Sequence, residues 1–76
     1  MRNTAQCDII IGKKIEENRI MRGLSLEDLA DQLEMSHQLL YRYEKGANRI
    51  SATRLCFIAD ALRVSIEELL PEAKMR

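Results

Sequence analysis

The apolar residues of this chain recur every three or four positions, which is the spacing of one face of an α-helix. In a first segment, over residues 8–22, the side chains of Ile11, Ile15 and Arg19 share such a face. The same spacing returns in a second segment after Ser25 and in a fourth segment after Ser51. Their inward positions are Leu26, Leu29, Ala30, Leu33, Leu55, Ile58, Ala59 and Leu62. Because no stretch shows the alternation of a β-strand, the pattern predicts an all-helical domain.

Cap residues predict where these helices begin and end. Four serines stand at expected N-cap positions: Ser25, Ser36, Ser51 and Ser65. Asp28 and Glu68 lie three residues after two of them and complete capping-box patterns. Gly23 and Gly46 suit the left-handed position that follows a helix end, and Pro71 stops the last segment. The signals therefore predict five short helices.

The link between the second and third helices is short. Only Glu34, Met35 and Ser36 join them, and this length is typical of a helix-turn-helix. Ala30 is small enough to let the two helices approach closely. In the third helix, residues 36–45, we expect Leu40 to face the core, which leaves most other side chains of its first half facing outward.

Composition narrows the class of protein. The chain has 76 residues, 46% of them hydrophobic and 32% charged, as expected for one small folded domain. No apolar run approaches the roughly 20 residues that cross a bilayer, and no secretory signal is visible, so we expect no membrane association and a cytoplasmic location. Cys7, Cys56 and the lone His37 lack metal-ligand spacing or a catalytic constellation. We therefore expect neither an enzyme nor a metal or other cofactor.

Charge is unevenly distributed although its sum is zero. Residues 25–35 carry four acidic side chains and no basic one, whereas residues 36–54 carry four basic side chains against one acidic. The four basic residues are Arg42, Lys45, Arg49 and Arg54. A neutral chain can thus present a basic face beside an acidic one, and a basic face is what nucleic acid attracts.

The segment GKKIEENRIMRGLSLEDLADQLEMSHQLLYRYEKGANRISATRLCFIADALRVSIEELL resembles the DNA-binding domain of lambda repressor and Cro-like proteins, the XRE family. The matching landmarks are Gly12, Arg19, Gly23-Leu24-Ser25, Leu29-Ala30, Tyr43-Glu44-Lys45-Gly46, Leu55, Ile58-Ala59, Leu62 and Val64-Ser65. The stretch YEKGANRIS is particularly close to many bacterial members. The resemblance implies an all-α, five-helix lambda-repressor-like domain over residues 9–70, with a flexible arm at 1–8 and a tail at 71–76.

The resemblance also implies which residues touch double-stranded DNA, with helix 36–45 in the major groove. The base-reading positions are His37, Gln38, Leu39, Tyr41 and Arg42. The chemistry suits this role, since Gln38 can read adenine, Arg42 can read guanine and Leu39 can pack on a thymine methyl. The positions that contact the DNA backbone are Ser36, Lys45, Asn48, Arg49 and the helix N-terminus at Leu26. Arg19 and Glu44 match a structural pair that ties the first helix to the third.

Two departures from the family pattern affect these expectations. Family members usually have glutamine where this chain has Leu26, so a side-chain hydrogen bond to phosphate is lost and the backbone N–H remains. They often have glycine where this chain has Glu34. A non-glycine residue in the left-handed conformation expected there costs roughly 1 kcal/mol.

The resemblance implies a sequence-specific transcriptional regulator, in particular a repressor or autoregulator that works as a homodimer on two half-sites. Phe57, Ile66 and Leu70 are expected to form an outward apolar patch on the fourth and fifth helices, which makes them the candidate dimer interface. The alternative is a protein-interaction module of the same fold, such as an antitoxin. Outward Leu39, Tyr41 and Phe57 would then contact a protein partner.

Overall fold

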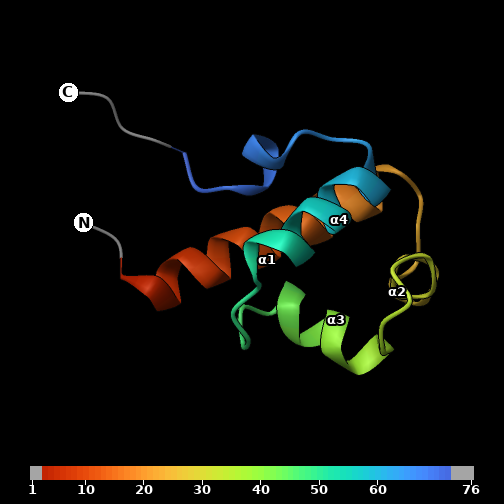
Figure 1. Cartoon of the computed structure of the whole chain (residues 1–76), viewed down its shortest axis with the longest axis horizontal. Helices are drawn as coiled ribbons and strands as arrows, with labels where there is room; N and C mark the ends of the chain where they lie inside the picture. The colour runs from red at the N-terminus through yellow and green to blue at the C-terminus, as the bar shows by residue number, and fades with distance from the viewer. Residues whose placement is uncertain (1–2, 73–76) are drawn as a thin grey trace.

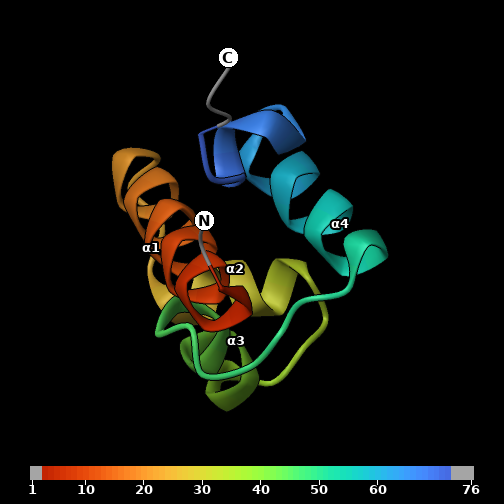
Figure 2. The ribbon, with the colours of Figure 1, turned by 90° about the vertical axis from the view of Figure 1, so that its left-hand side faces the viewer.

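The computed structural model describes residues 3–72 and shows four α-helices and one 3₁₀ helix in that range. The elements are α1 (Thr4–Met21), α2 (Leu26–Gln32), α3 (His37–Glu44), α4 (Ala52–Leu62) and η1 (Ile66–Leu69). Helix α1 contacts α3, α4 and η1, and α1 and α4 stand on either side of the domain (Figure 2). Helix α3 lies at the edge of the domain opposite η1, as both views show (Figures 1 and 2). The all-helical class and the helix-turn-helix formed by α2 and α3 are confirmed.

Three of the four predicted serine caps are formed. The side-chain oxygens of Ser25, Ser36 and Ser51 accept hydrogen bonds from backbone N–H groups three residues later, at 2.9, 3.0 and 3.1 Å. At Ser25 the carboxylate of Asp28 also accepts from the serine N–H at 3.3 Å, which completes the capping box. The caps satisfy backbone donors that would otherwise lack partners at the start of α2, α3 and α4.

The predicted cap at Ser65 is wrong. Its side chain makes no capping hydrogen bond, and the fifth helix is a single 3₁₀ turn rather than an α-helix. The N–H of Glu68, which the serine side chain would have capped, donates instead to the backbone carbonyl of Ser65 at 3.1 Å. This i→i+3 bond is the 3₁₀ pattern, and it leaves no free donor at that position.

The first helix begins four residues earlier than predicted. Asn3 is its N-cap and forms a capping box with Gln6, whose side chain accepts from the Asn3 N–H at 3.2 Å. Residues 4–8 of the expected flexible arm are therefore helical. Residues 1 and 2 of that arm, and residues 73–76 of the expected tail, lie outside the described range.

The core lies between the five elements, each of which contributes buried side chains. Its buried apolar side chains are Ile15, Leu29, Ala30, Leu40, Tyr43, Leu55, Ile58, Ala59, Leu62 and Leu69. The helical spacing of the sequence predicted most of these positions. Ala30 is fully buried beside the turn, where its carbonyl accepts from the N–H of Met35 at 3.0 Å. The small side chain thus permits the close approach of α2 and α3.

Two backbone features set the position of α3. Glu34 has φ of 55°, the left-handed conformation expected in the tight turn. On the other side, Gly12 of α1 lies so close to α3 that a Cβ atom there would collide with the carbonyl oxygen of Tyr43 and stand 2.6 Å from that of Glu44. Real side chains do not come this close, so α3 can occupy its place only because residue 12 is glycine.

Candidate nucleic-acid interface

Helix α3 presents one face to the core and the opposite face to solvent. Leu40 is fully buried and Tyr43 is 5% exposed, which holds the helix in place. The predicted base-reading residues His37, Gln38, Tyr41 and Arg42 are exposed. All four carry groups that can form hydrogen bonds, so the outward face of α3 is polar along both of its turns.

Leu39 is less available than expected. Its side chain is half-buried and packs against the core. It lies four residues before Tyr43, so it shares part of the core-facing side of α3. Only the remaining edge of Leu39 faces the same direction as the exposed residues.

The predicted backbone-contacting residues surround the two ends of α3. Ser36 precedes the helix, and Lys45 and Arg49 follow it, all three exposed. The Lys45 ammonium lies 5.4 Å from the centre of the Tyr41 ring, within the range of a cation–π contact. Asn48 is half-buried.

Two of these positions have contacts that the sequence did not indicate. The Arg49 Nε atom lies 3.6 Å from a carboxylate oxygen of Asp8 in α1, so a basic side chain of the interface has a competing acidic neighbour. Leu26 stands at the start of α2 and its half-buried side chain packs against the core. At Leu26 only the backbone N–H is suited to a phosphate.

The predicted pair of Arg19 and Glu44 ties α1 to the end of α3. Arg19 donates from Nε to Glu44 Oε2 at 2.7 Å and from Nη2 to Oε1 at 3.1 Å. A third guanidinium nitrogen, Nη1, donates to the backbone carbonyl of Leu24 at 2.9 Å. The Glu44 side chain is only 3% exposed and that of Arg19 12%. The hydrogen bond to Glu44, reinforced by its charge, raises the pKa of Arg19 above the ordinary arginine value, although burial opposes this.

A second tie to α3 comes from α4 and was not predicted. Arg54 donates from Nη1 to the hydroxyl of the buried Tyr43 at 3.0 Å. The sequence had indicated only that Arg54 belongs to the basic stretch 36–54, and its position is exposed. The available signal was Tyr43 itself, because a buried tyrosine hydroxyl usually requires a hydrogen-bond partner.

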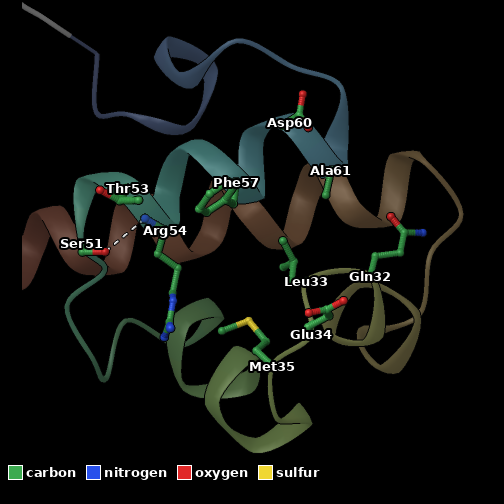
Figure 3. A pocket seen from close by; sticks show the side chains of 10 residues that line it. All are labelled: Gln32, Leu33, Glu34, Met35, Ser51, Thr53, Arg54, Phe57, Asp60 and Ala61. Atoms are coloured by element: carbon green, nitrogen blue, oxygen red, sulfur yellow. Dashed lines mark hydrogen bonds between the residues drawn. The ribbon is translucent and has the colours of Figure 1, made fainter.

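Phe57, the centre of the predicted dimer interface, is 64% exposed on α4. Figure 3 shows it beside an open hollow between α4 and the turn that joins α2 to α3. Leu33, Met35 and Ala61 give the hollow apolar walls, and its rim carries Arg54, Glu34 and Asp60. Ile66 and Leu70 are half-buried against the core, so Phe57 is the most accessible of the three predicted interface residues.

The described part of the chain offers no sign of two other kinds of site. Among residues 3–72 no three His, Cys, Asp or Glu side chains gather as metal ligands. Within that range, too, no helix is both long and apolar enough to cross a membrane.

The capped α2, the left-handed turn and the exposed α3 define a helix-turn-helix domain. Consistent with this geometry, the sequence profile of the helix-turn-helix family matches residues 15–69. The chain therefore belongs to the helix-turn-helix family.

A relative in Rickettsia conorii, described as an uncharacterized HTH-type transcriptional regulator, is 48% identical to the chain over 60 residues. The match covers 79% of this chain and 48% of the relative. The chain thus spans about half the length of this relative and of a second one from Rickettsia prowazekii.

Two solved structures share the fold over nearly their whole length. One is the restriction-modification controller protein C.AhdI from Aeromonas hydrophila, with a TM-score of 0.78 and 27% identity over 82% of this chain and 94% of that one. The other is the DNA-binding domain of BldD, with a TM-score of 0.81 and 28% identity over 88% of this chain and 97% of that one.

Proposed function

We propose that this chain is a sequence-specific DNA-binding transcriptional regulator that inserts α3 into the major groove. The observation that carries the proposal is the geometry of α3. Its inner side is fixed by Leu40, Tyr43 and the Glu44 ion pair, while hydrogen-bonding side chains line its outer side. A helix held rigidly with a free polar face is what reading of base edges requires. The regulatory role named for the Rickettsia relative, and the DNA-binding domain of BldD, support the same function.

Within α3, the exposed side chains divide the work by their chemistry. Gln38 suits the N6 and N7 atoms of adenine, and Arg42 suits the O6 and N7 atoms of guanine. His37 and Tyr41 lie beside them and contribute at neighbouring positions, and the free edge of Leu39 suits a thymine methyl group. These contacts supply the sequence preference.

Affinity comes from the residues around the helix. Lys45 at the end of α3 and Arg49 in the loop that follows are exposed, and their positive charge suits the neutralisation of phosphates. Ser36, Asn48 and the backbone N–H of Leu26 add hydrogen bonds that set the register on the duplex. Because Arg49 lies 3.6 Å from the Asp8 carboxylate, a phosphate that binds Arg49 must either displace Asp8 or compete with it for the guanidinium group.

The proposed protein acts as a homodimer in the cytoplasm, as a repressor or autoregulator, and carries out no catalysis. One such domain makes few base contacts, and two copies on half-sites one DNA turn apart would raise specificity. Phe57 of α4, together with Ile66 of η1 and Leu70 at its end, is the proposed contact. A protein partner on the exposed Phe57 and Tyr41, as in an antitoxin, is the second candidate, favoured by their 64% and 53% exposure.

Selection of bound duplexes from a random pool tests the function. We expect one preferred sequence for the wild type. Arg42→Ala is expected to weaken binding by about 1–3 kcal/mol and to relax preference at one base position. Arg63→Ala is the matched control, because it removes the same charge at the far end of α4, next to η1. Equal losses in the two variants would contradict the assignment of Arg42.

A further inference from the structure

A hydrogen bond connects the two helices of the helix-turn-helix across their turn. His37 Nε2, at the start of α3, lies 2.9 Å from Asp31 Oδ1, near the end of α2. His37 is one of the proposed base-reading residues, whereas Asp31 belongs to the acidic helix that precedes them. The bond therefore joins a residue that faces DNA to one that DNA would repel.

The acceptor chemistry of Asp31 determines which nitrogen of His37 carries a proton. A carboxylate can only accept hydrogen bonds, so the bond requires the proton on Nε2. In the neutral ring the other nitrogen, Nδ1, is then left as an acceptor. The same bond limits the movement of the ring, because it holds the ring at Nε2.

The histidine that results can discriminate between bases. Its side chain remains 49% exposed, so part of the ring is open to a ligand. An acceptor in the major groove pairs with the amino group of adenine or cytosine and is mismatched against the acceptor atoms of guanine or thymine. The opposite tautomer would show the reverse preference.

The hydrogen bond between His37 and Asp31 adds little to the stability of the fold. The Asp31 side chain is 73% exposed, and exposed ion pairs contribute little to folding. The bond matters because it involves His37, a proposed base-reading residue, and not because it is strong.

We propose that Asp31 is a specificity-determining positioning residue, which holds His37 as a hydrogen-bond acceptor for an amino-bearing base. This inference rests on the proposed function, since it requires that α3 reads DNA. It extends the reading surface to a residue of α2 that touches no base itself.

Substitution of Asp31 by asparagine separates positioning from simple contact. The new side chain in Asp31→Asn can still hydrogen-bond to the ring, but its amide offers both a donor and an acceptor, so it no longer selects one tautomer. Binding constants for duplexes with each of the four bases at each operator position would be measured at mildly alkaline pH. The proteins are the wild type, Asp31→Asn, His37→Ala and the double variant. Glu27→Gln is the control, because it removes one negative charge from the exposed face of the same helix.

At one operator position we expect Asp31→Asn to lower the preference for the amino-bearing base by roughly threefold to tenfold, the effect of one hydrogen bond. Glu27→Gln is expected to leave the profile of base preference unchanged. In the His37→Ala background, Asp31→Asn is expected to change nothing further at that position. Thermal melts establish that every variant is folded.

Two results would overturn the inference while leaving the proposed function intact. One is specific binding by the wild type with an unchanged base profile in Asp31→Asn. The other is a change caused by Asp31→Asn that persists in the His37→Ala background. A folded wild type that prefers no duplex over another would overturn the proposed function and this inference together.

Discussion

The position of α3 depends on single residues that lie far from it in the sequence, and Arg19 is the clearest case because it binds Glu44 at the end of this helix. Glu44 is buried at the end of α3, and three guanidinium nitrogens of Arg19 are used, two by the carboxylate and one by a backbone carbonyl. Because the pKa of Arg19 is raised, the stability linked to its proton is fully present near neutral pH and is lost only as the pH rises through and above the ordinary arginine range. The tie therefore holds throughout the physiological range.

Glu44→Ala is expected to lower the free energy of unfolding by about 3–5 kcal/mol, because it leaves a buried guanidinium unpaired. A domain of this size has only roughly that much stability, so this variant is expected to be largely unfolded at the start of a thermal melt. Glu44→Gln keeps a hydrogen-bonding shape without the charge and is expected to melt between the alanine variant and the wild type. Glu27→Ala, at an exposed position of α2, is expected to shift stability by less than about 0.5 kcal/mol. A Glu27 variant less stable than both Glu44 variants would refute the tie.

Pairs of interacting side chains could be predicted from the sequence only where the family resemblance implied them. Arg19 and Glu44 were expected, but the bonds from Arg54 to Tyr43 and from His37 to Asp31 were not. Helical periodicity states which face a residue occupies and not which side chain it meets. The half-burial of Leu39 has the same origin, because a residue one turn before a core tyrosine lies at the border between the two faces.

The helices themselves were largely predictable, because their caps are local. Ser25, Ser36 and Ser51 each bond to a backbone N–H three residues away, so the signal and its effect lie within one turn. The last element, η1, is a four-residue 3₁₀ helix and not the α-helix that was predicted. In it the N–H of Glu68 bonds to the Ser65 carbonyl, and this bond replaces the expected side-chain cap. The early start of α1 followed from the capping box of its N-cap asparagine, a polar signal placed before any apolar repeat.

The contact between α1 and α3 decides whether replacing Gly12 by alanine raises or lowers the stability of the domain. In an exposed helix interior, glycine to alanine stabilises by roughly 0.5–1 kcal/mol. At Gly12 the new methyl group would collide with the Tyr43 carbonyl oxygen and meet the Glu44 carbonyl oxygen at 2.6 Å. Gly12→Ala is therefore expected to destabilise by about 1–3 kcal/mol in denaturant unfolding, as overpacked cores do.

Lys13→Ala, one residue further along α1 at an exposed position, is the control for the glycine variant. It removes a side chain from the same helix without entering the contact with α3, and its effect is expected to stay within about 0.5 kcal/mol. An increase in stability of Gly12→Ala would mean that α1 and α3 are further apart than the structure places them.

For the molecule as a whole, the proposed dimer depends on Phe57. Burial of a phenylalanine that is 64% exposed in one copy would favour association of two copies through α4. Sedimentation equilibrium at a protein concentration of about 100 μM, well above a micromolar dissociation constant, is expected to show a wild-type dimer and a Phe57→Glu monomer, since the charge would be buried in the interface. Ala52→Glu, an exposed position on the same helix that does not line the hollow with Phe57, is the control for added charge. A wild type that stays monomeric, or a Phe57→Glu protein that dimerises unchanged, would exclude this interface.

The most direct test of DNA binding by α3 and its basic surroundings is the salt dependence of the affinity for the selected duplex. Neutralisation of roughly two phosphates per protomer by Lys45 and Arg49 predicts that log K falls with log salt concentration with a slope of about −2 per protomer. Lys45→Ala is expected to reduce that slope by about 1 without changing the preferred sequence. A folded protein that binds no duplex at about 50 mM salt, where such contacts are strong, would contradict the account.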